Sequence, residues 1–156
     1  MINPNDSIRY TNVISRKYEF QYQELENVFN DFVQEVIHLG ATIKGPLFYS
    51  VNNVPMDEVL LSEFFIPIHE DDLVVPEDMR FHSYFSVENM ISIYVHNHFE
   101  TKTEVAYRLL LDYISDNELE QVTPIFHVIS GDHSMQYAMI KIGVQKVLNM
   151  EPASNI

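Results

Sequence analysis

The chain has 156 residues, of which 46% are hydrophobic and none is cysteine. These values are typical of a single globular domain and exclude fibrous and disordered chains. The absence of cysteine excludes disulfides, thiol catalysis and cysteine-based zinc sites, and it suits a reducing compartment. No stretch approaches the roughly 18 apolar residues of a membrane span, and the first residues lack a signal-peptide pattern. We therefore expect a cytoplasmic protein without a membrane partner.

The formal net charge is −14, from nine Lys and Arg against 23 Asp and Glu. Because a DNA duplex is bound largely through basic side chains on its phosphates, and no basic patch is concentrated in the sequence, we expect no nucleic-acid partner. Two interpretations of the charge remain. It keeps the protein soluble, or it attracts a basic protein partner.

The first part of the chain predicts a strand, a helix and two further strands. β-Branched and aromatic residues indicate a strand around Thr11–Phe20, and apolar residues at helical spacing indicate a helix over about Gln21–Leu39 that stops at Gly40. Strands then follow at Pro46–Val51 and Val59–Ile68, with a turn at Asn52-Asn53. The predicted buried stripe of the helix comprises Leu25, Val28, Phe29, Phe32, Val33, Val36 and Ile37.

An acidic, proline-interrupted segment, residues 69–79, predicts a solvated linker, after which Arg80–Val87 predicts an additional extended piece. The same order of elements then returns. It consists of a strand at Met90–His98, a helix opened by the capping box Thr101-x-x-Glu104, strands at Pro124–Ile129 and Gln136–Val144, and a turn at Ser130-Gly131-Asp132. The predicted stripe of this helix comprises Val105, Leu109, Leu110, Tyr113 and Ile114.

The two parts align with each other at a fixed offset. At 78 residues Val13 meets Ile91 and Phe29 meets Tyr107, and at 76 residues Glu63 meets Met139. This self-similarity predicts one domain of two repeats, about residues 8–68 and 80–144, followed by a tail at 145–156.

This pattern resembles the GyrI-like small-molecule-binding family, whose superfamily includes the effector-binding domains of bacterial transcription activators. The resemblance rests on Tyr107–Glu118, Thr123–His127, Ile142-Gly143-Val144 and the strand ending Ile66-Pro67-Ile68. It implies an α+β fold in which duplicated strand-helix-strand-strand units form an antiparallel sheet, with two helices on one side and a concave groove on the other. Members bind hydrophobic, often cationic molecules in that groove, and many carry a fused helix-turn-helix, for which this length leaves no room.

Glu63 is the carboxylate candidate for such a groove, because it interrupts an otherwise apolar strand. On the inward side of the pleat a desolvated carboxylate could pair with a cation; on the other side it would simply be solvated. Met139 takes the equivalent place in the second repeat. The predicted ligand-binding set is Glu63, Tyr18, Phe20, Tyr49, Tyr94, His96, Tyr107, His127, Tyr137 and Met139. The alternative for each aromatic ring is ordinary core packing.

His96-x-His98 would place two imidazoles on one strand face, with Glu100, His127 or His82 as distant third ligands. No third ligand lies nearby in sequence, and we expect neither a metal nor a cofactor. Motifs of phosphate-binding loops, dinucleotide folds, serine hydrolases and zinc proteases are absent, and Ser130-Gly131-Asp132-His133 is typical of a turn.

The leading hypothesis is a non-enzymatic binding protein that holds a small hydrophobic or cationic molecule in a groove between two repeats. One alternative is an acidic, immunity- or antitoxin-like protein that masks a basic partner. A second alternative is a small hydrolase in which Glu63 acts as general base. The residues give no indication of the oligomeric state.

Overall fold

The computed structural model describes residues 1–52, 59–96, 99–132 and 135–148. These residues form six strands, two α-helices and a short 3-10 turn, η1. The elements are β1 (Ile2–Gln21), η1 (Tyr22–Glu24), α1 (Leu25–His38), β2 (Phe48–Val51), β3 (Val59–Pro67), β4 (Met79–His96), α2 (Phe99–Asp116), β5 (Leu119–Asp132) and β6 (Met135–Lys146). We call β1 to β3 with α1 the first half, and β4 to β6 with α2 the second half.

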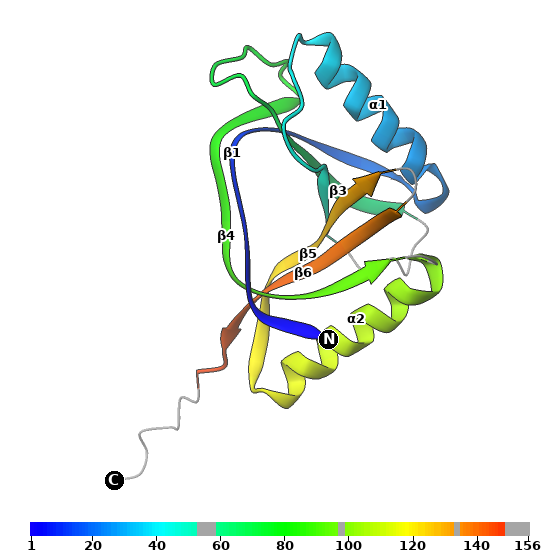
Figure 1. Ribbon diagram of the computed structural model, residues 1–156, viewed down its shortest axis with the longest axis vertical. Helices are drawn as coiled ribbons and strands as arrows, with labels where there is room; N and C mark the ends of the chain where they lie inside the picture. Colours follow the sequence, from blue (N-terminus) through cyan, green and yellow to red (C-terminus); the bar gives the residue numbers. More distant parts are fainter. Residues whose placement is uncertain (53–58, 97–98, 133–134, 149–156) are drawn as a thin grey trace.

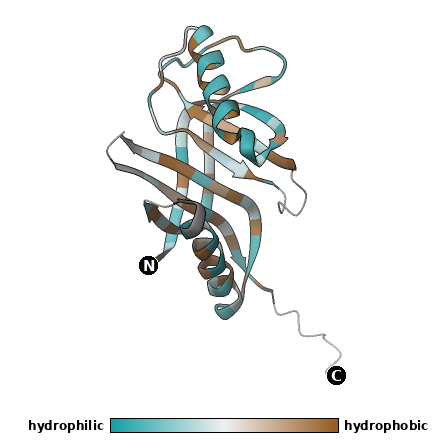
Figure 2. Cartoon of the chain, turned by 90° about the vertical axis from the view of Figure 1, so that its right-hand side faces the viewer, coloured by the Kyte–Doolittle hydropathy of each residue, from teal (hydrophilic) through white to brown (hydrophobic). Residues whose placement is uncertain are grey.

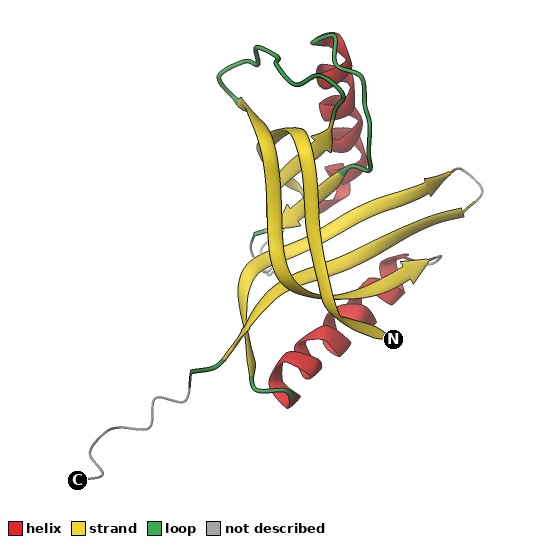
Figure 3. Cartoon of the chain, turned by 60° about the vertical axis from the view of Figure 1, so that its left-hand side comes forward, coloured by secondary structure: helices red, strands yellow, loops and turns green. Residues whose placement is uncertain are grey.

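All strand pairs are antiparallel, and the strands close into a ring in the order β1-β3-β2-β5-β6-β4, in which β4 returns to pair with β1 (Figure 3). Both helices lie on the same side of the strands, α1 over the first half and α2 over the second (Figure 1). The predicted α+β class, with antiparallel strands and two helices, is confirmed.

The two longest strands extend well beyond their predicted bounds. β1 begins at Ile2 instead of Thr11, and the predicted extended piece Arg80–Val87 is continuous with the next strand in β4. The two strands pair from Ile2 opposite Ile93 to Arg16 opposite Met79. The segment before Thr11 has no apolar alternation, so its strand conformation comes from this long-range pairing.

Helix α1 ends as predicted. Gly40 has a left-handed φ of 87°, and its N–H donates to the carbonyl of Ile37, which is a helix-terminating conformation that glycine adopts without steric cost. Phe32 and Val36 of the predicted stripe are buried, whereas Ile37 is exposed.

Helix α2 begins at Phe99, two residues before the predicted cap. Its buried side chains are Ala106, Leu110 and Ile114, which repeat every four residues. Val105 and Leu109 were predicted for this stripe but are exposed. The helix instead contacts the strands through the residues that follow them, Ala106 and Leu110.

The core is divided between the two faces of the strands. One cluster around Phe64 packs beneath α1, and another around Leu110 packs beneath α2. A third cluster lies on the face away from the helices, which we call the inner face. Its buried members are Ile8, Val13, Phe48, Phe65, Met90, Phe126 and Val128. Because successive side chains of a strand point to opposite faces, neighbouring residues such as Phe64 and Phe65 belong to different clusters. Figure 2 shows apolar segments on the strands and on the helices.

The connections differ from their predictions at several points. Residues 69–78 contain neither helix nor strand, β5 continues through the predicted turn to Asp132, and β6 includes the first two residues of the predicted tail. Asn53, His98, His133 and residues 149–156 lie outside the described residues. Among the described helices, none is long and apolar enough to cross a membrane.

Candidate functional site

Glu63 lies on the inner face, where strand β3 passes β1. Its carboxylate oxygen Oε2 accepts a hydrogen bond of 2.8 Å from Ser15 Oγ, and the same Oγ lies 2.8 Å from Nε2 of His82 on β4. Ser15 is fully buried, whereas Glu63 and His82 are partly buried. Three strands thus bring a carboxylate, a hydroxyl and an imidazole together. We call these three residues the Glu63 cluster.

Aromatic rings border the Glu63 cluster. The rings of Phe65 and Phe85 have centroids 4.7 Å apart, and they lie 6.3 Å and 5.7 Å from the imidazole of His82. Phe48 stacks on Phe65 at 4.7 Å and links this wall to the buried cluster of the inner face. A carboxylate beside several ring faces is an arrangement suited to a cation with an apolar body.

Burial lowers the pKa of His82, and the positive charge of Arg80 lowers it further, whereas the charge of Glu63 opposes the shift. The net pKa lies below the ordinary value of 6.5. His82 is therefore largely neutral near pH 7 and contributes little positive charge beside the carboxylate.

A related cluster occupies the equivalent place in the second half. Ser92 Oγ donates a hydrogen bond of 2.6 Å to Asp6 Oδ2, and Lys141 Nζ lies 3.2 Å from that same oxygen. Nζ also donates to the carbonyl of Ser7 at 2.9 Å. Both charged side chains are largely buried. Burial alone would raise the pKa of Asp6, but the hydrogen bonds and the Lys141 charge hold it below its usual value. We call this group the Asp6 cluster.

The backbone shows that the two serines are equivalent. Asn12 and Asn89 have left-handed φ values of 58° and 56°, and each precedes its serine by three residues. Ser15 pairs with Phe65 as Ser92 pairs with Lys141. The first strands therefore align at an offset of 77 (89 − 12), one less than the offset predicted from sequence.

Four further predicted ligand residues lie on strands β4 and β6. The ring of Tyr94 is 4.8 Å from that of Tyr137 and 5.2 Å from that of His96, and Met139 is opposite Tyr94 in the ladder. Tyr94 and His96 also line a cleft of about 260 Å³ against the exposed side of α2. Their role as ligand contacts stays a prediction.

The five remaining predicted residues face the helices, on the opposite side of the strands from Glu63. Tyr18, Phe20 and Tyr49 gather around Phe64, at centroid distances of 5.3, 5.9 and 5.4 Å. The ladder between β2 and β5 places His127 beside Tyr49, and Tyr107 reaches His127 from α2. The structure thus divides the predicted set between two faces.

His127 is almost completely buried and is bonded through both ring nitrogens. The hydroxyl of Tyr49 lies 3.3 Å from Nδ1, and the hydroxyl of Tyr107 is hydrogen-bonded to Nε2. A neutral imidazole has one donor and one acceptor, so one tyrosine donates and the other accepts. Burial lowers the pKa of His127 to about 4 and raises those of Tyr49 and Tyr107. This network joins the two halves.

Two hydroxyl groups on this helix-facing side have no partner within the described part of the chain. They belong to Tyr18 and Ser62, which are opposite each other in the β1–β3 ladder. Burial raises the pKa of Tyr18 to about 12, although the nearby guanidinium of Arg16 opposes this. An unpaired buried hydroxyl is destabilising by roughly 1–3 kcal/mol.

Sequence reasoning did not identify Ser15, and it considered His82 only as a distant metal ligand. The repeated segments Asn12-Val13-Ile14-Ser15 and Asn89-Met90-Ile91-Ser92 contain the signal that would have identified Ser15. No three side chains capable of holding a metal ion gather among the residues that the structure describes.

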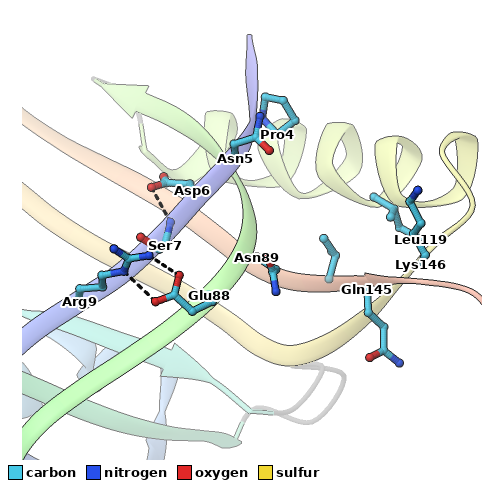
Figure 4. Close-up of a pocket in the computed structure, with 11 residues that line it drawn as sticks. Pro4, Asn5, Asp6, Ser7, Arg9, Glu88, Asn89, Leu119, Gln145 and Lys146 are labelled. Atoms are coloured by element: carbon cyan, nitrogen blue, oxygen red, sulfur yellow. Dashed lines mark hydrogen bonds and ion pairs between the residues drawn. The ribbon is translucent and has the colours of Figure 1, made fainter.

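A larger cavity, of about 540 Å³, lies elsewhere, where β1 passes the middle of β4 and the end of β6 (Figure 4). Its charged side chains include Arg9, Glu88 and Asp6, which pair with one another or with neighbours. Arg9 forms two hydrogen bonds with the carboxylate of Glu88, and Asp6 is held by Ser92 and Lys141. None of the predicted ligand residues lines this cavity, and we regard it as a solvated hollow.

The fold is similar to solved structures of low sequence identity. The C-terminal domain of EcmrR matches with a TM-score of 0.70 and 13% identity, over 92% of this chain and 99% of that domain. A hydrolase from Listeria innocua matches with a TM-score of 0.51 and 9% identity, over 89% of this chain and 91% of that one. At these identities the similarity concerns the fold alone. No curated protein sequence matches the chain.

One further match corrects the expectation that nucleic acid has no place among the partners. EcmrR in a cryo-EM structure with DNA matches with a TM-score of 0.69 and 12% identity, over 92% of this chain and 59% of the EcmrR chain. The fold thus occurs within a protein bound to DNA. The expectation was wrong because it rested on the net charge of these residues alone, and that charge says nothing about DNA contacts made by another part of a larger protein.

The sequence itself assigns the family. The model of a family described as "Domain of unknown function (DUF5085)" matches residues 9–146, which include all six strands in whole or in part and both helices. The chain therefore belongs to the family described as Domain of unknown function DUF5085.

Proposed function

We propose that the chain is a non-enzymatic binding module that holds a small organic cation with an apolar body beside Glu63 on the inner face. One observation carries the proposal. The Asp6 cluster contains a built-in ammonium group, that of Lys141, whereas the Glu63 cluster has a phenyl ring, that of Phe65, at the equivalent position.

The electrostatic reason is that no ion pair in the described part of the chain neutralises the carboxylate of Glu63, although Lys17 is opposite it in the β1–β3 ladder. Within the described residues, no Lys or Arg forms an ion pair with Glu63, and the neighbouring His82 is largely neutral near pH 7. A partly desolvated carboxylate is stabilised by an opposite charge within about 4–6 Å. A bound cation would supply this charge, as Lys141 does for Asp6.

The neighbouring rings favour an aromatic or otherwise apolar body on that cation. The ring of Phe85 is partly exposed, and its neighbour Phe65 is buried. A positive charge over such ring faces gains up to about 2 kcal/mol when it is desolvated. The similarity to the EcmrR domain and the resemblance to GyrI-like proteins support a ligand-binding role.

The arrangement of the cluster argues against a hydrolase in which Ser15 would be the nucleophile. In a serine hydrolase the imidazole bridges the serine and the carboxylate. Here the serine hydroxyl bridges the other two groups, and Ser15 is fully buried, so its oxygen is inaccessible to a substrate.

Calorimetry with benzyltrimethylammonium and its uncharged carbon analogue, neopentylbenzene, tests the proposal. We expect saturable binding of the cation only. Glu63→Gln should weaken it at least about tenfold, which corresponds to the loss of one charged interaction, whereas Glu88→Gln removes an exposed carboxylate and should have no effect. Equal binding of the two probes, or equal effects of the two variants, would contradict the proposal. Native mass spectrometry of the purified protein would show any small molecule that remains bound.

A further inference from the structure

The side chain beside Glu63 can itself become a cation. His82 reaches Ser15 Oγ through Nε2 at 2.8 Å, and that hydroxyl donates to Glu63 at 2.8 Å. Because the hydroxyl proton is directed at the carboxylate, Nε2 must carry the proton of the other hydrogen bond. The charge of the ring then depends on the second nitrogen, Nδ1. When Nδ1 is protonated, His82 becomes an imidazolium that is separated from the Glu63 carboxylate only by the Ser15 hydroxyl.

Protonation would give the first half the same set of groups that the second half has permanently. The Asp6 cluster contains a carboxylate, a serine hydroxyl and the ammonium of Lys141. With an imidazolium at His82, the Glu63 cluster would contain a carboxylate, a serine hydroxyl and a cation. The difference is that lysine stays charged throughout the physiological range, whereas histidine does not.

The groups facing His82 come from three strands. Glu63 from β3 is the carboxylate, Ser15 from β1 is neutral, and Arg80 on β4 itself adds a positive charge. The rings of Phe65 and Phe85 complete the surroundings. Burial and Arg80 favour the neutral imidazole, and Glu63 favours the charged one. The protonation state of His82 therefore depends on whether the charge of Glu63 is already neutralised by another cation.

We propose that the His82 imidazolium and the bound organic cation compete for Glu63, so that the cation binds with release of a proton from His82 and dissociates on acidification. This inference rests on the proposed function, because it concerns the same site. The exchange is balanced, since one positive charge replaces another and the proton passes to solvent. Where binding requires neutral His82, affinity falls by at most about tenfold per pH unit below the pKa of His82.

The coupling between the two side chains can be measured without a ligand. Proton NMR of the imidazole Cε1–H follows the titration of His82, with His82→Gln identifying its signal. Glu63→Gln should lower the pKa of His82, because the opposing negative charge is removed, and Glu88→Gln should leave it unchanged. An unchanged His82 pKa in Glu63→Gln would overturn the inference.

Calorimetry of benzyltrimethylammonium between about pH 8 and pH 5 then tests the competition itself. In the wild type, affinity should fall on acidification, with proton release detectable as a dependence of the heat on the buffer. In His82→Gln both the pH dependence of the affinity and the proton release should disappear. If His82→Gln keeps the wild-type pH profile, the competition is wrong and the proposed function stands. If the wild type binds no cation at about pH 8, both are wrong.

Discussion

Tyr49 and His127 face each other across the β2–β5 ladder with their ring centroids 4.8 Å apart, and they are bonded through the tyrosine hydroxyl and Nδ1. One belongs to each half. This pair therefore ties the two halves together on the side that faces the helices, and its stability depends on an uncharged imidazole.

The free energy of unfolding should fall as the pH decreases from about 6.5 to about 4. The pKa of His127 is about 4 in the folded protein and has its ordinary value of 6.5 when unfolded. Between these values the unfolded chain binds more protons, so acid favours unfolding, by on the order of 3 kcal/mol in total. Urea unfolding at several pH values measures this. His127→Gln should lose that part of the pH dependence, and an identical profile in the variant would contradict the assignment.

Two tyrosine-to-phenylalanine variants should change stability in opposite directions. Tyr18→Phe removes a buried hydroxyl without a partner in the described structure and should stabilise by about 1 kcal/mol. Tyr49→Phe removes a hydroxyl bonded to His127 and should destabilise by about 1 kcal/mol or more. Urea unfolding near neutral pH compares them. Destabilisation by Tyr18→Phe would mean that its hydroxyl has a partner after all.

Gly143→Ala should destabilise the protein by about 1–3 kcal/mol, because an added Cβ would lie 2.4 Å from Thr123 Cγ2. Thr123 cannot simply turn away, since its Oγ1 accepts the hydrogen bond of the Gly143 N–H at 2.8 Å. The double variant with Thr123→Ser removes the clashing methyl group and keeps the hydroxyl. It should recover part of the lost stability in thermal unfolding, because the retained Oγ1 would still lie 2.9 Å from the added Cβ; no recovery would place the strain elsewhere.

Lys141→Met should lower the free energy of unfolding by about 3–5 kcal/mol, because it leaves the Asp6 carboxylate buried without its cation. Adding Asp6→Asn should restore much of this loss. The exposed pair of Arg9 and Glu88 provides the control, and Glu88→Gln should change stability by less than about 1 kcal/mol. Similar losses for the two pairs would contradict the assignment of Asp6 and Lys141 as a buried ion pair.

Much of the fold follows from local sequence patterns. The stripe around Phe32 and Val36 predicted α1, and Gly40 marked its end with the conformation that the structure has. The repeated order of elements predicted the class. The closure of the ring was not predictable, because it depends on the pairing of Ile2–Arg16 with a distant strand, and local patterns do not identify a partner so far along the chain.

The candidate site could be predicted only in part. Glu63 was identified because it interrupts an apolar strand, but the alternation of side chains could not decide which face it shares with the aromatic residues. Tyr49 and His127 proved to be on the other face. Ser15 carries no chemical signal of its own, since a buried serine is recognised as part of a site only once its partners from other strands are known.

The β1–β4 ladder has a consequence for a chain cut between residues 69 and 78. One fragment would hold β1 to β3 and the other β4 to β6, so the ring closes only through the β1–β4 and β2–β5 pairs between the two fragments. We therefore expect neither fragment to fold alone and the two, when mixed, to reassemble. Such a pair would form a complementation system, in which recovery of the folded state reports that both fragments are present in the same solution.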